Sequence, residues 1–339
     1  MKIGIIGAGA LGSLIAFYLS AHADTWLLSR RREQIDAINR NGLRRELNGI
    51  EDIRHPHAAA DPAAIGPCDI VLVLTKSYAT AWAAEQAAHL LKLDTPCQGD
   101  KETRRQGATD SVDCLSPCLL VSPSLTLVVT LQNGLGNREL LARRLGETYV
   151  GQGVTAQGAT LLGLGQVRHA GQGRTVFGAA PDHARMATLV ALFNASGLPA
   201  ELSDDLDALV WGKLVVNAGI NALTALLRVP NGALAASADA RALMASAIAE
   251  AAAVAQARGT MLPYDDPLAH TLAIAQATSA NHSSMLQDVL RGSPTEIDAI
   301  NGAVEREGRR MGVPTPVNSM LAALVRALEA TTGARARTP

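Results

Sequence analysis

Three polar side chains recur at every fourth position of the apolar stretch 211–223, and they are the strongest candidates for chemistry. Lys213, Asn217 and Asn221 would share one face of a helix. Burying an ammonium group and two amides without partners would cost several kcal/mol, so we expect them to face a polar ligand or a cleft. An ammonium group placed there could stabilise and protonate an oxygen on which negative charge develops. The alternative, a solvent stripe on an amphipathic helix, would carry more Glu, Arg and Lys.

A second polar cluster spans residues 281–298 and precedes a helix of apolar periodicity. It contains Ser284, Thr295, Glu296 and Asp298. One interpretation is that Pro294 or Thr295 begins the helix and that the two acids merely favour its N-terminal dipole. The other interpretation is that these side chains belong to a site.

A glycine-rich turn lies between an apolar strand at residues 2–6 and a helix expected from about 11 to 19. Its residues are Gly7, Ala8, Gly9, Ala10, Leu11 and Gly12. In such a turn the first glycine permits the tight bend, the second lets the backbone approach a pyrophosphate, and the third lets helix and strand pack closely. The strand and helix on either side favour a dinucleotide site over a glycine turn without a ligand.

The end of the second strand, residues 25–28, indicates which nicotinamide cofactor binds. A carboxylate there would bind a ribose 2′-hydroxyl, whereas an arginine would accept a 2′-phosphate. The chain continues with Ser29 and three arginines, and the first acid is Glu33. NADPH is therefore favoured over NADH, with Arg30 as the first candidate for the contact and Arg31 as the second.

Strands and helices alternate through the first half of the chain, which predicts the α/β class with a Rossmann-type, doubly wound parallel sheet. Apolar runs at 69–75 and 125–131 are typical of strands covered on both faces. Lys76 and Asn133 follow these two strands, at the carboxyl ends where ligands bind in such sheets. The sequence after about residue 203 predicts an all-helical C-terminal domain. We therefore expect a dinucleotide-binding domain at 1–202 and a helical substrate domain at 203–332.

Residues 94–124 interrupt this alternation with a polar segment of no sustained period. We expect a mobile surface insertion. Three of the four cysteines lie in it, but they lack the paired spacing of a zinc site, so we expect no metal.

The composition excludes several classes of protein. The formal net charge of −1 gives no strong field to attract nucleic acid or an anionic membrane. No uninterrupted apolar run approaches the roughly 18 residues of a membrane span, and glycines break the N-terminal apolar stretch that a secretion signal would need. We expect a cytoplasmic enzyme that binds neither nucleic acid nor membrane. Its Ala-rich helices could supply a homodimer surface.

Together the motifs resemble those of the ketopantoate reductase (2-dehydropantoate 2-reductase) family. The resemblance runs in order from residue 1 to about 330. The matching segments are Gly7–Gly12, Thr75–Lys76, Gln132–Gly136, Gly153–Thr155, His169–Gly173, Trp211–Asn221, Val229–Gly232, Ser284–Asp288, Thr295–Gly302 and Gly312–Pro316.

The resemblance implies a role for each matching position. Lys213 would be the general acid that protonates the nascent alkoxide, and Glu296 would orient it and keep it charged. Four side chains would hold the substrate's carboxylate and hydroxyl: Asn217, Asn221, Asn231 and Ser284. Asn281 is a fifth candidate for a substrate contact. Asn133 would lie between cofactor and substrate. Lys76, Glu296 and the backbone of Ala159 would contact the cofactor.

The implied activity is NADPH-dependent reduction of 2-dehydropantoate to (R)-pantoate in pantothenate and coenzyme A biosynthesis. Two departures concern the substrate: Gln157 stands where many members have His, and Ser293 where many have Arg. One alternative is therefore a reductase of another branched 2-oxo acid. A second is a non-catalytic NADPH-binding sensor, although a sensor has no use for a proton donor.

Overall fold

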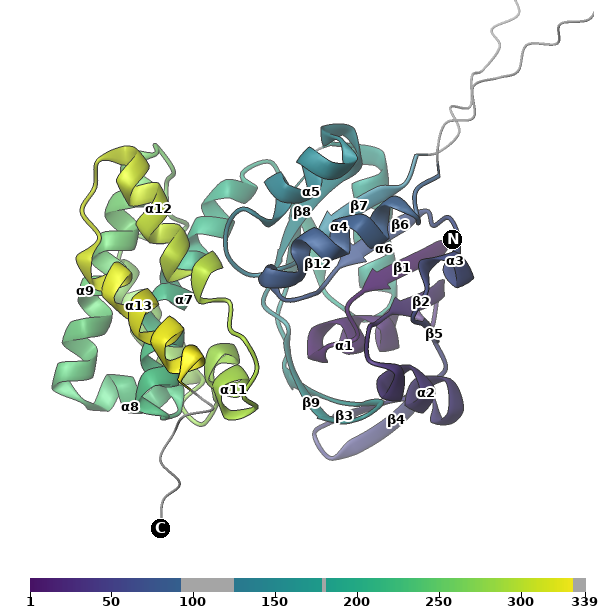
Figure 1. The fold of residues 1–339 in the computed structure, drawn as a ribbon, viewed down its shortest axis with the longest axis horizontal. Coiled ribbons are helices and arrows are strands. Elements are labelled where there is room, and N and C mark those ends of the chain that lie inside the picture. Colours follow the sequence, from purple (N-terminus) through teal and green to yellow (C-terminus); the bar gives the residue numbers. More distant parts are fainter. Residues whose placement is uncertain (93–124, 179–180, 332–339) are drawn as a thin grey trace, which may run out of the picture.

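The computed structural model describes residues 1–92, 125–178 and 181–331. An α/β part and a helical part lie side by side, with the N-terminus at the far edge of the α/β part (Figure 1). The insertion expected at 94–124 lies outside the described residues.

Eight strands form the main sheet, in the order β12-β11-β8-β7-β6-β1-β2-β5. Their bounds are β1 (Lys2–Ile6), β2 (Asp24–Leu28), β5 (His57–Ala59), β6 (Ile70–Val73), β7 (Leu127–Thr130), β8 (Val150–Thr155), β11 (Thr175–Gly178) and β12 (Ala200–Ser203). All neighbours are parallel except β8 and β11, which are antiparallel. The predicted Rossmann-type sheet is thus confirmed, with one antiparallel junction that the sequence did not indicate.

Helices cover both faces of this sheet. Their bounds are α1 (Ala10–Leu19), α2 (Arg32–Asn41), α3 (Pro62–Ile65), η1 (Ser77–Ala79), α4 (Thr80–Ala88), α5 (Asn137–Leu145), η2 (Glu147–Tyr149) and α6 (His183–Ala195). Successive side chains of β6 enter opposite faces: Ile70 and Leu72 pack in the cluster that includes α1 and α6, and Val71 and Val73 in the cluster that includes α4 and α5. Burial on both sides explains the continuous apolar runs in the sequence.

A second sheet, in the order β4-β3-β10-β9, packs beside α1. Its strands are β3 (Leu43–Leu47), β4 (Ile50–Arg54), β9 (Gly158–Gly163) and β10 (Gln166–Gly171). Every residue of β4 is exposed, and its acids pair across the hairpin, Arg44 with Glu51 at 2.8 Å and Arg45 with Asp52 at 3.2 Å.

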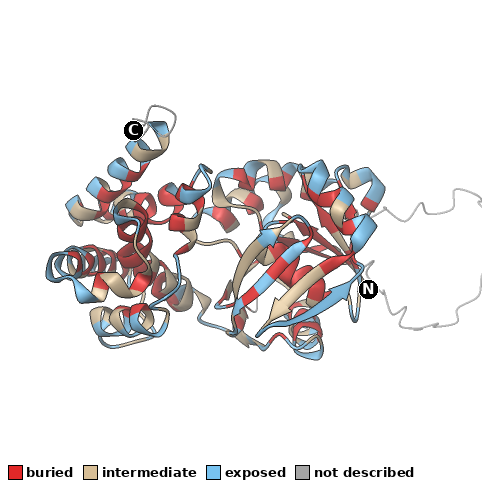
Figure 2. Ribbon diagram, turned by 90° about the horizontal axis from the view of Figure 1, so that it is seen from below, coloured by how far each residue is buried: buried red, intermediate tan, exposed pale blue. Residues whose placement is uncertain are grey.

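The helical part consists of α7 (Leu206–Leu227), α8 (Asn231–Ala236), α9 (Ala238–Ala257), α10 (Pro267–Ala277), α11 (Ser284–Leu290), η3 (Ile297–Ala299), α12 (Asn301–Met311) and α13 (Pro316–Ala330). The all-helical C-terminal part that we predicted is confirmed. Helix α7 is its core: α9, α10, α11 and α13 pack against it, and most of its residues are buried. Figure 2 shows that buried residues fill the interior of both parts of the fold.

Within the described residues, α7 is also long and apolar enough to cross a membrane, with a mean hydropathy of 1.4 in its most apolar window. The expectation concerned uninterrupted apolar runs, and polar residues do interrupt this helix. Lys213, Asn217 and Asn221 lower the mean hydropathy of the helix, but it still reaches 1.4. Because 78% of that window is buried inside the protein, and the core helix of a globular protein passes the same test, the finding is weak evidence for a membrane.

Candidate active site

The glycine turn at the end of β1 has the geometry of a phosphate cradle. Gly7 has φ +115°, and a Cβ there would lie 2.8 Å from the backbone nitrogen of Thr75. A Cβ on Gly12 would lie 1.8 Å from the Gly7 carbonyl oxygen, so these two glycines are required by packing. A Cβ on Gly9 would meet no described atom within 4 Å. The space beside Gly9 and the first N–H groups of α1 suit an anionic phosphate.

The arginines expected to bind a 2′-phosphate lie at the carboxyl end of β2 and are exposed. The Arg30 guanidinium lies 4.9 Å from the ring centroid of Trp82, on α4, in a cation–π contact. Arg31 precedes α2, and its backbone N–H donates to Ser29 Oγ at 3.2 Å. Trp82 could not be identified from the sequence, because nothing local to α4 relates it to Arg30.

The loops that follow β6 and β7 are tied together by one amide. Gln132 Nε2 donates to the Thr75 carbonyl at 3.0 Å and to Thr80 Oγ1 at 2.9 Å. These bonds fix the backbone on which Lys76 and Asn133 stand. The carboxyl ends of two parallel strands thus form one rigid edge, as expected for a ligand site.

Glu296 brings the helical part onto this edge. Its side chain is 5% exposed. Oε1 accepts from the backbone N–H of Ser77 at 3.0 Å, and Oε2 lies 3.4 Å from Asn133 Nδ2 and 3.6 Å from Lys76 Nζ. Glu296 precedes η3, and α12 begins only at Asn301. Glu296 therefore does not lie in the first turn of α12, where a carboxylate would favour the helix dipole. Three contacts with the α/β part explain its burial.

Lys76 has a second, closer partner that we did not assign from the sequence. Its Nζ donates to Asp288 Oδ2 at 2.6 Å. Although burial opposes the charge on Lys76, the carboxylates of Glu296 and Asp288 outweigh it and raise the pKa of the ammonium. Burial also raises the pKa of Asp288, against the opposing effect of Lys76. Asp288 lies in a family motif, but no local pattern showed that it would meet a lysine 212 residues away.

Lys213 projects from α7 toward the ends of β7 and β8. Its Nζ donates to the Thr155 carbonyl at 2.7 Å. Burial lowers the pKa of its ammonium from 10.5 to about 8, and the charge of Glu296 partly opposes this. Its side chain lines a small cavity with residues of both parts of the fold: Gln132, Asn133, Gly134, Gln152, Val154, Val210 and Leu214. An amine with that pKa, beside a cavity, can deliver a proton near neutral pH.

We expected Glu296 to orient Lys213 directly. Among the described side chains, however, the ion-pair partner of Glu296 is Lys76, and Lys213 forms no ion pair within 4.0 Å. Glu296 acts on Lys213 through its charge.

The amide candidates lie along α7 and at the starts of two helices. Asn217 is half-buried and Asn221 is buried, one and two turns beyond Lys213. Asn231 opens α8, its Nδ2 donates to Thr278 Oγ1 at 2.9 Å, and its buried Oδ1 has no partner in the described structure. The Asn231 backbone N–H donates to the Asn281 carbonyl at 3.0 Å, so these two candidates are neighbours, although Asn281 itself is exposed.

Ser284 is the first residue of α11, and the hydroxyl of the preceding residue, Ser283, anchors the start of this helix. Thr224 Oγ1 donates to Ser283 Oγ at 2.7 Å, which joins the start of α11 to α7. Ala159 stands apart in the second sheet, in β9 opposite His169 of β10, on the side that packs against α1. The structure thus groups the α7, α8 and α11 candidates, and separates them from Ala159.

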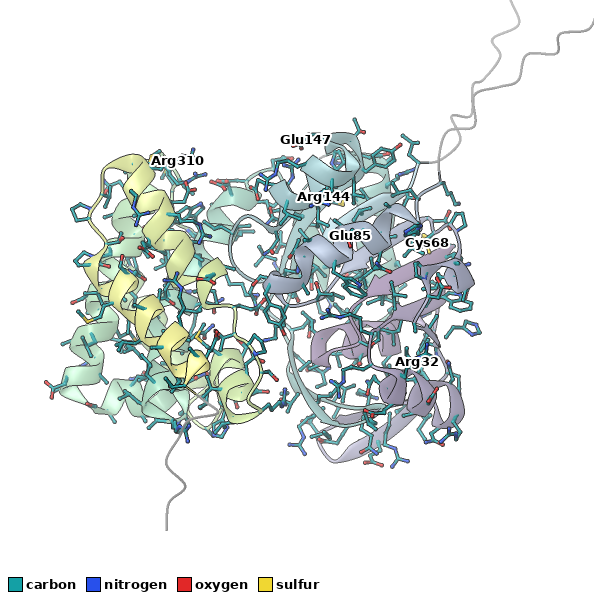
Figure 3. The ribbon with its side chains drawn as sticks, viewed as in Figure 1. Arg32, Cys68, Glu85, Arg144, Glu147 and Arg310 are labelled. Carbon is teal, nitrogen blue, oxygen red and sulfur yellow. The ribbon has the colours of Figure 1, made fainter. Side chains whose placement is uncertain are left out.

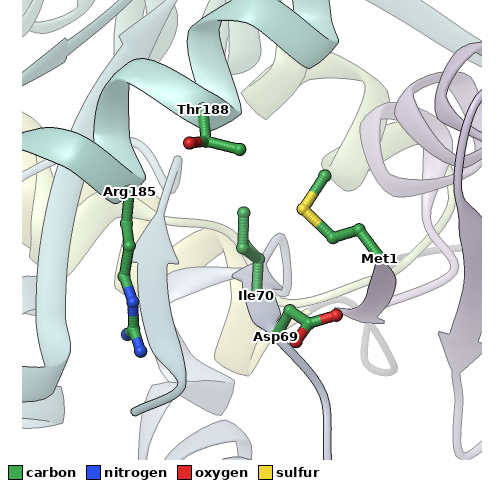
Figure 4. Close-up of a pocket in the computed structure, with 5 residues that line it drawn as sticks. All are labelled: Met1, Asp69, Ile70, Arg185 and Thr188. Atoms are coloured by element: carbon green, nitrogen blue, oxygen red, sulfur yellow. The ribbon is translucent and has the colours of Figure 1, made fainter. Parts of the chain in front are cut away.

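Two other features lie away from this site. A cavity of about 290 Å³ opens at the amino ends of β1 and β6, lined by Met1, Asp69, Ile70, Arg185 and Thr188 (Figure 4). Ligands of parallel sheets bind at the opposite ends of the strands. The buried thiol of Cys68 lies at the edge of the α/β part that is remote from the helical part (Figure 3). Burial raises its pKa to about 11, so it is not a reactive thiolate.

Comparison with known protein families gives two matches. The family described as "Ketopantoate reductase PanE/ApbA" matches residues 3–97 and 108–182, and that described as "Ketopantoate reductase PanE/ApbA C terminal" matches residues 205–329.

Individual relatives match over the whole chain. The 2-dehydropantoate 2-reductase of Halobacterium salinarum is 33% identical, over 96% of this chain and 98% of its own length, and that of Bacillus subtilis is 31% identical, over 98% and 99%. The structure of a PanE/ApbA family ketopantoate reductase from Ralstonia eutropha is 33% identical, covers 98% of this chain and 100% of its own, and has a TM-score of 0.81. D-mandelate dehydrogenase with NADH and anilino(oxo)acetate is 26% identical, covers 98% and 100%, and has a TM-score of 0.84.

Proposed function

This chain belongs to the ketopantoate reductase family, and from that premise we propose that it reduces 2-dehydropantoate to (R)-pantoate with NADPH, in pantothenate and coenzyme A biosynthesis. Its relatives named 2-dehydropantoate 2-reductase match over nearly their full length. The observation that carries the proposal is the ammonium of Lys213 at a cavity between the two parts of the fold, with a pKa of about 8.

Lys213 is the proposed general acid. Reduction of a 2-oxo acid places negative charge on the former ketone oxygen, and an ammonium group beside that oxygen both stabilises the charge and supplies the proton. The hydrogen bond to the Thr155 carbonyl aims the amine from α7 toward the strand ends. The buried carboxylate of Glu296 favours the protonated amine of Lys213, so that the general acid carries its proton before the reaction.

The substrate would be held by neutral donors and acceptors around Lys213. Asn217 and Asn221 continue its helix face, and the unpartnered Oδ1 of Asn231 is an acceptor suited to a hydroxyl. Ser284, with Asn281 nearby, completes the proposed set at the start of α11. Asn133 is proposed to contact both substrate and cofactor.

The α/β part would hold the cofactor, which supplies a hydride when bound. The pyrophosphate of the cofactor would occupy the open space beside Gly9, and Arg30 or Arg31 would bind the 2′-phosphate of NADPH. Lys76, Asn133, Glu296 and the backbone of Ala159 are the further proposed contacts. Residues 1–202 are the proposed dinucleotide domain and 203–332 the proposed substrate domain.

A second candidate function is reduction of another branched 2-oxo acid. The similarity to D-mandelate dehydrogenase, solved with NADH and an oxoacetate, favours it. So do Gln157 and Ser293, which replace residues common in the family. A non-catalytic sensor is disfavoured, because a proton donor would have no role in one.

Oxidation of NADPH with 2-dehydropantoate, followed at 340 nm, tests the proposal. NADH is the matched cofactor control, and a panel of 2-oxo acids is the substrate control. A higher kcat/KM for a different 2-oxo acid would select the second candidate. Tight NADPH binding without turnover of any 2-oxo acid in the panel would indicate a non-catalytic sensor.

As a small-molecule reductase, the protein is proposed to be cytoplasmic, without nucleic-acid or membrane partners, and its helical part could form a homodimer.

A further inference from the structure

Asp288 is a buried acid to which the proposed chemistry gives no role. Its side chain is 8% exposed and lies on α11, four residues after Ser284. A buried carboxylate is costly unless it is paired, and removing one partner of such a pair leaves an uncompensated charge. Its partner, Lys76, belongs to the other part of the fold.

Lys76 has two carboxylates within reach, at unequal distances. Its Nζ lies 2.6 Å from Asp288 Oδ2 but 3.6 Å from Glu296 Oε2, so the full hydrogen bond goes to Asp288. Within the described part of the chain, Glu296 Oε2 consequently has only long contacts, to Lys76 and, at 3.4 Å, to Asn133 Nδ2. If Asp288 lost its charge, the closest anion to Lys76 would be Glu296.

We propose that Asp288 is a positioning residue for the proposed reduction, because it holds the Lys76 ammonium away from Glu296 and so leaves the charge of Glu296 to act on Lys213. This inference rests on the proposed roles of Lys213 and Glu296. Asp288 itself touches neither the cavity beside Lys213 nor the glycine turn.

The other charged and titratable groups around this pair do not replace Asp288. Tyr78 lies two residues after Lys76, and Arg291, which follows the last residue of α11, lowers the pKa of Asp288 through its charge. Burial and the two carboxylates raise the pKa of Tyr78, which keeps the phenol neutral near pH 8. Glu296 is therefore the acceptor to which Lys76 would turn.

The first experiment is a double-mutant cycle on kcat with Asp288→Asn and Lys76→Met. We expect Asp288→Asn alone to lower kcat at pH 8 by about five-fold, because loss of an interacting charge shifts a pKa by about one unit. Such a shift would lower the protonated fraction of Lys213 at pH 8 from about one half to about one tenth. In the Lys76→Met background the same change should alter kcat less than about two-fold. Equal losses in both backgrounds would show that Asp288 does not act through Lys76.

Matched variants separate this role from a structural one. Asp298→Asn removes an acid that is 70% exposed and pairs with Arg326, and should leave kcat unchanged. Asp288→Glu keeps the carboxylate and should restore most of the rate. If Asp288→Asn does not fold, Asp288→Ser provides the same comparison.

The second experiment does not depend on turnover. The chain has five lysines, Lys2, Lys76, Lys92, Lys101 and Lys213, so reductive ¹³C-methylation gives few side-chain NMR signals to titrate. In Asp288→Asn we expect the Lys213 signal to titrate about one pH unit lower than in the unsubstituted protein. An unchanged Lys213 titration would overturn the positioning role even if the substrate proved to be a different 2-oxo acid. Lack of turnover by the unsubstituted protein would instead overturn the proposed function.

Discussion

Replacing Lys213 by Met should stabilise the protein at neutral pH while removing its activity. Burial lowers the pKa of Lys213 from 10.5 to about 8. A difference of 2.5 units, at about 1.36 kcal/mol each, means that the charged amine costs the folded state about 3 kcal/mol at pH 7. Met keeps the hydrocarbon chain but leaves the Thr155 carbonyl without its donor, which costs about 1 kcal/mol. The expected net gain is about 2 kcal/mol.

The sign of this effect depends on pH. Between the folded pKa of about 8 and the unfolded pKa of 10.5, the unfolded chain binds the proton that the folded chain has released, so the stability of the unsubstituted protein rises with pH. At about pH 9.5 the cost of Lys213 has shrunk to about 1 kcal/mol, and the advantage of the Met variant should vanish.

Urea unfolding of both proteins at the two pH values measures this difference, and NADPH oxidation measures kcat, which should fall by a factor on the order of 10² or more. The reasoning from burial would be refuted if the Met variant were less stable than the unsubstituted protein at pH 7. It would also be refuted if the difference in unfolding free energy between the two proteins were the same at both pH values. Near-normal turnover would refute the role of Lys213 as general acid.

Three other outcomes follow from the site. Because Lys213 must be protonated to act, kcat should fall about ten-fold per pH unit above its pKa of about 8; a flat profile of saturated rates between pH 6 and 10 would count against it. Arg30→Ala should lower kcat/KM for NADPH by a factor on the order of 10–100 and leave that for NADH within about three-fold, since only NADPH carries the 2′-phosphate; equal losses would assign Arg30 another role. Gly9→Ala should melt normally but bind NADPH more weakly in a fluorescence titration, whereas Gly12→Ala, whose Cβ would lie 1.8 Å from the Gly7 carbonyl oxygen, should melt at a lower temperature; the reverse pattern would contradict the geometry of the turn.

The parts of the fold that the sequence revealed are those with strong local patterns. The glycine turn shows its role because three backbone requirements fall within six residues. Lys213, Asn217 and Asn221 show theirs because polar groups on one face of a buried helix need a reason to be there. The two central strands, β6 and β7, are fully buried, so their apolar runs could be recognised without knowing their neighbours.

The second sheet could not be found in this way. Strand β4 is exposed at every position, and its charged side chains carry no apolar periodicity. Strand β3 pairs with β10, more than a hundred residues later, so its partner was not visible locally either. The stabilising contacts of such edge strands are cross-strand pairs, which a single strand does not display.

The acids of the site were ambiguous for the same reason. Near a helix start, Glu296 could have been a residue that favours the helix dipole. The distinction came from contacts with Ser77 and Lys76, which lie in the first quarter of the chain. The pairing of Lys76 with Asp288, like the stacking of Arg30 on Trp82, depends on how the two parts of the fold meet.

The position of α7 at the centre of the helical part has a consequence for biosynthesis. The helix is complete once the ribosome has passed Leu227, but α9, α11 and α13, which cover it, are synthesised afterwards, to Ala330. Until then the nascent chain carries a helix as apolar as a membrane span without the helices that cover most of it. Such surface is prone to aggregation during synthesis. The helix that carries the proposed general acid is thus also an apolar segment that the growing chain exposes before its covering helices are made.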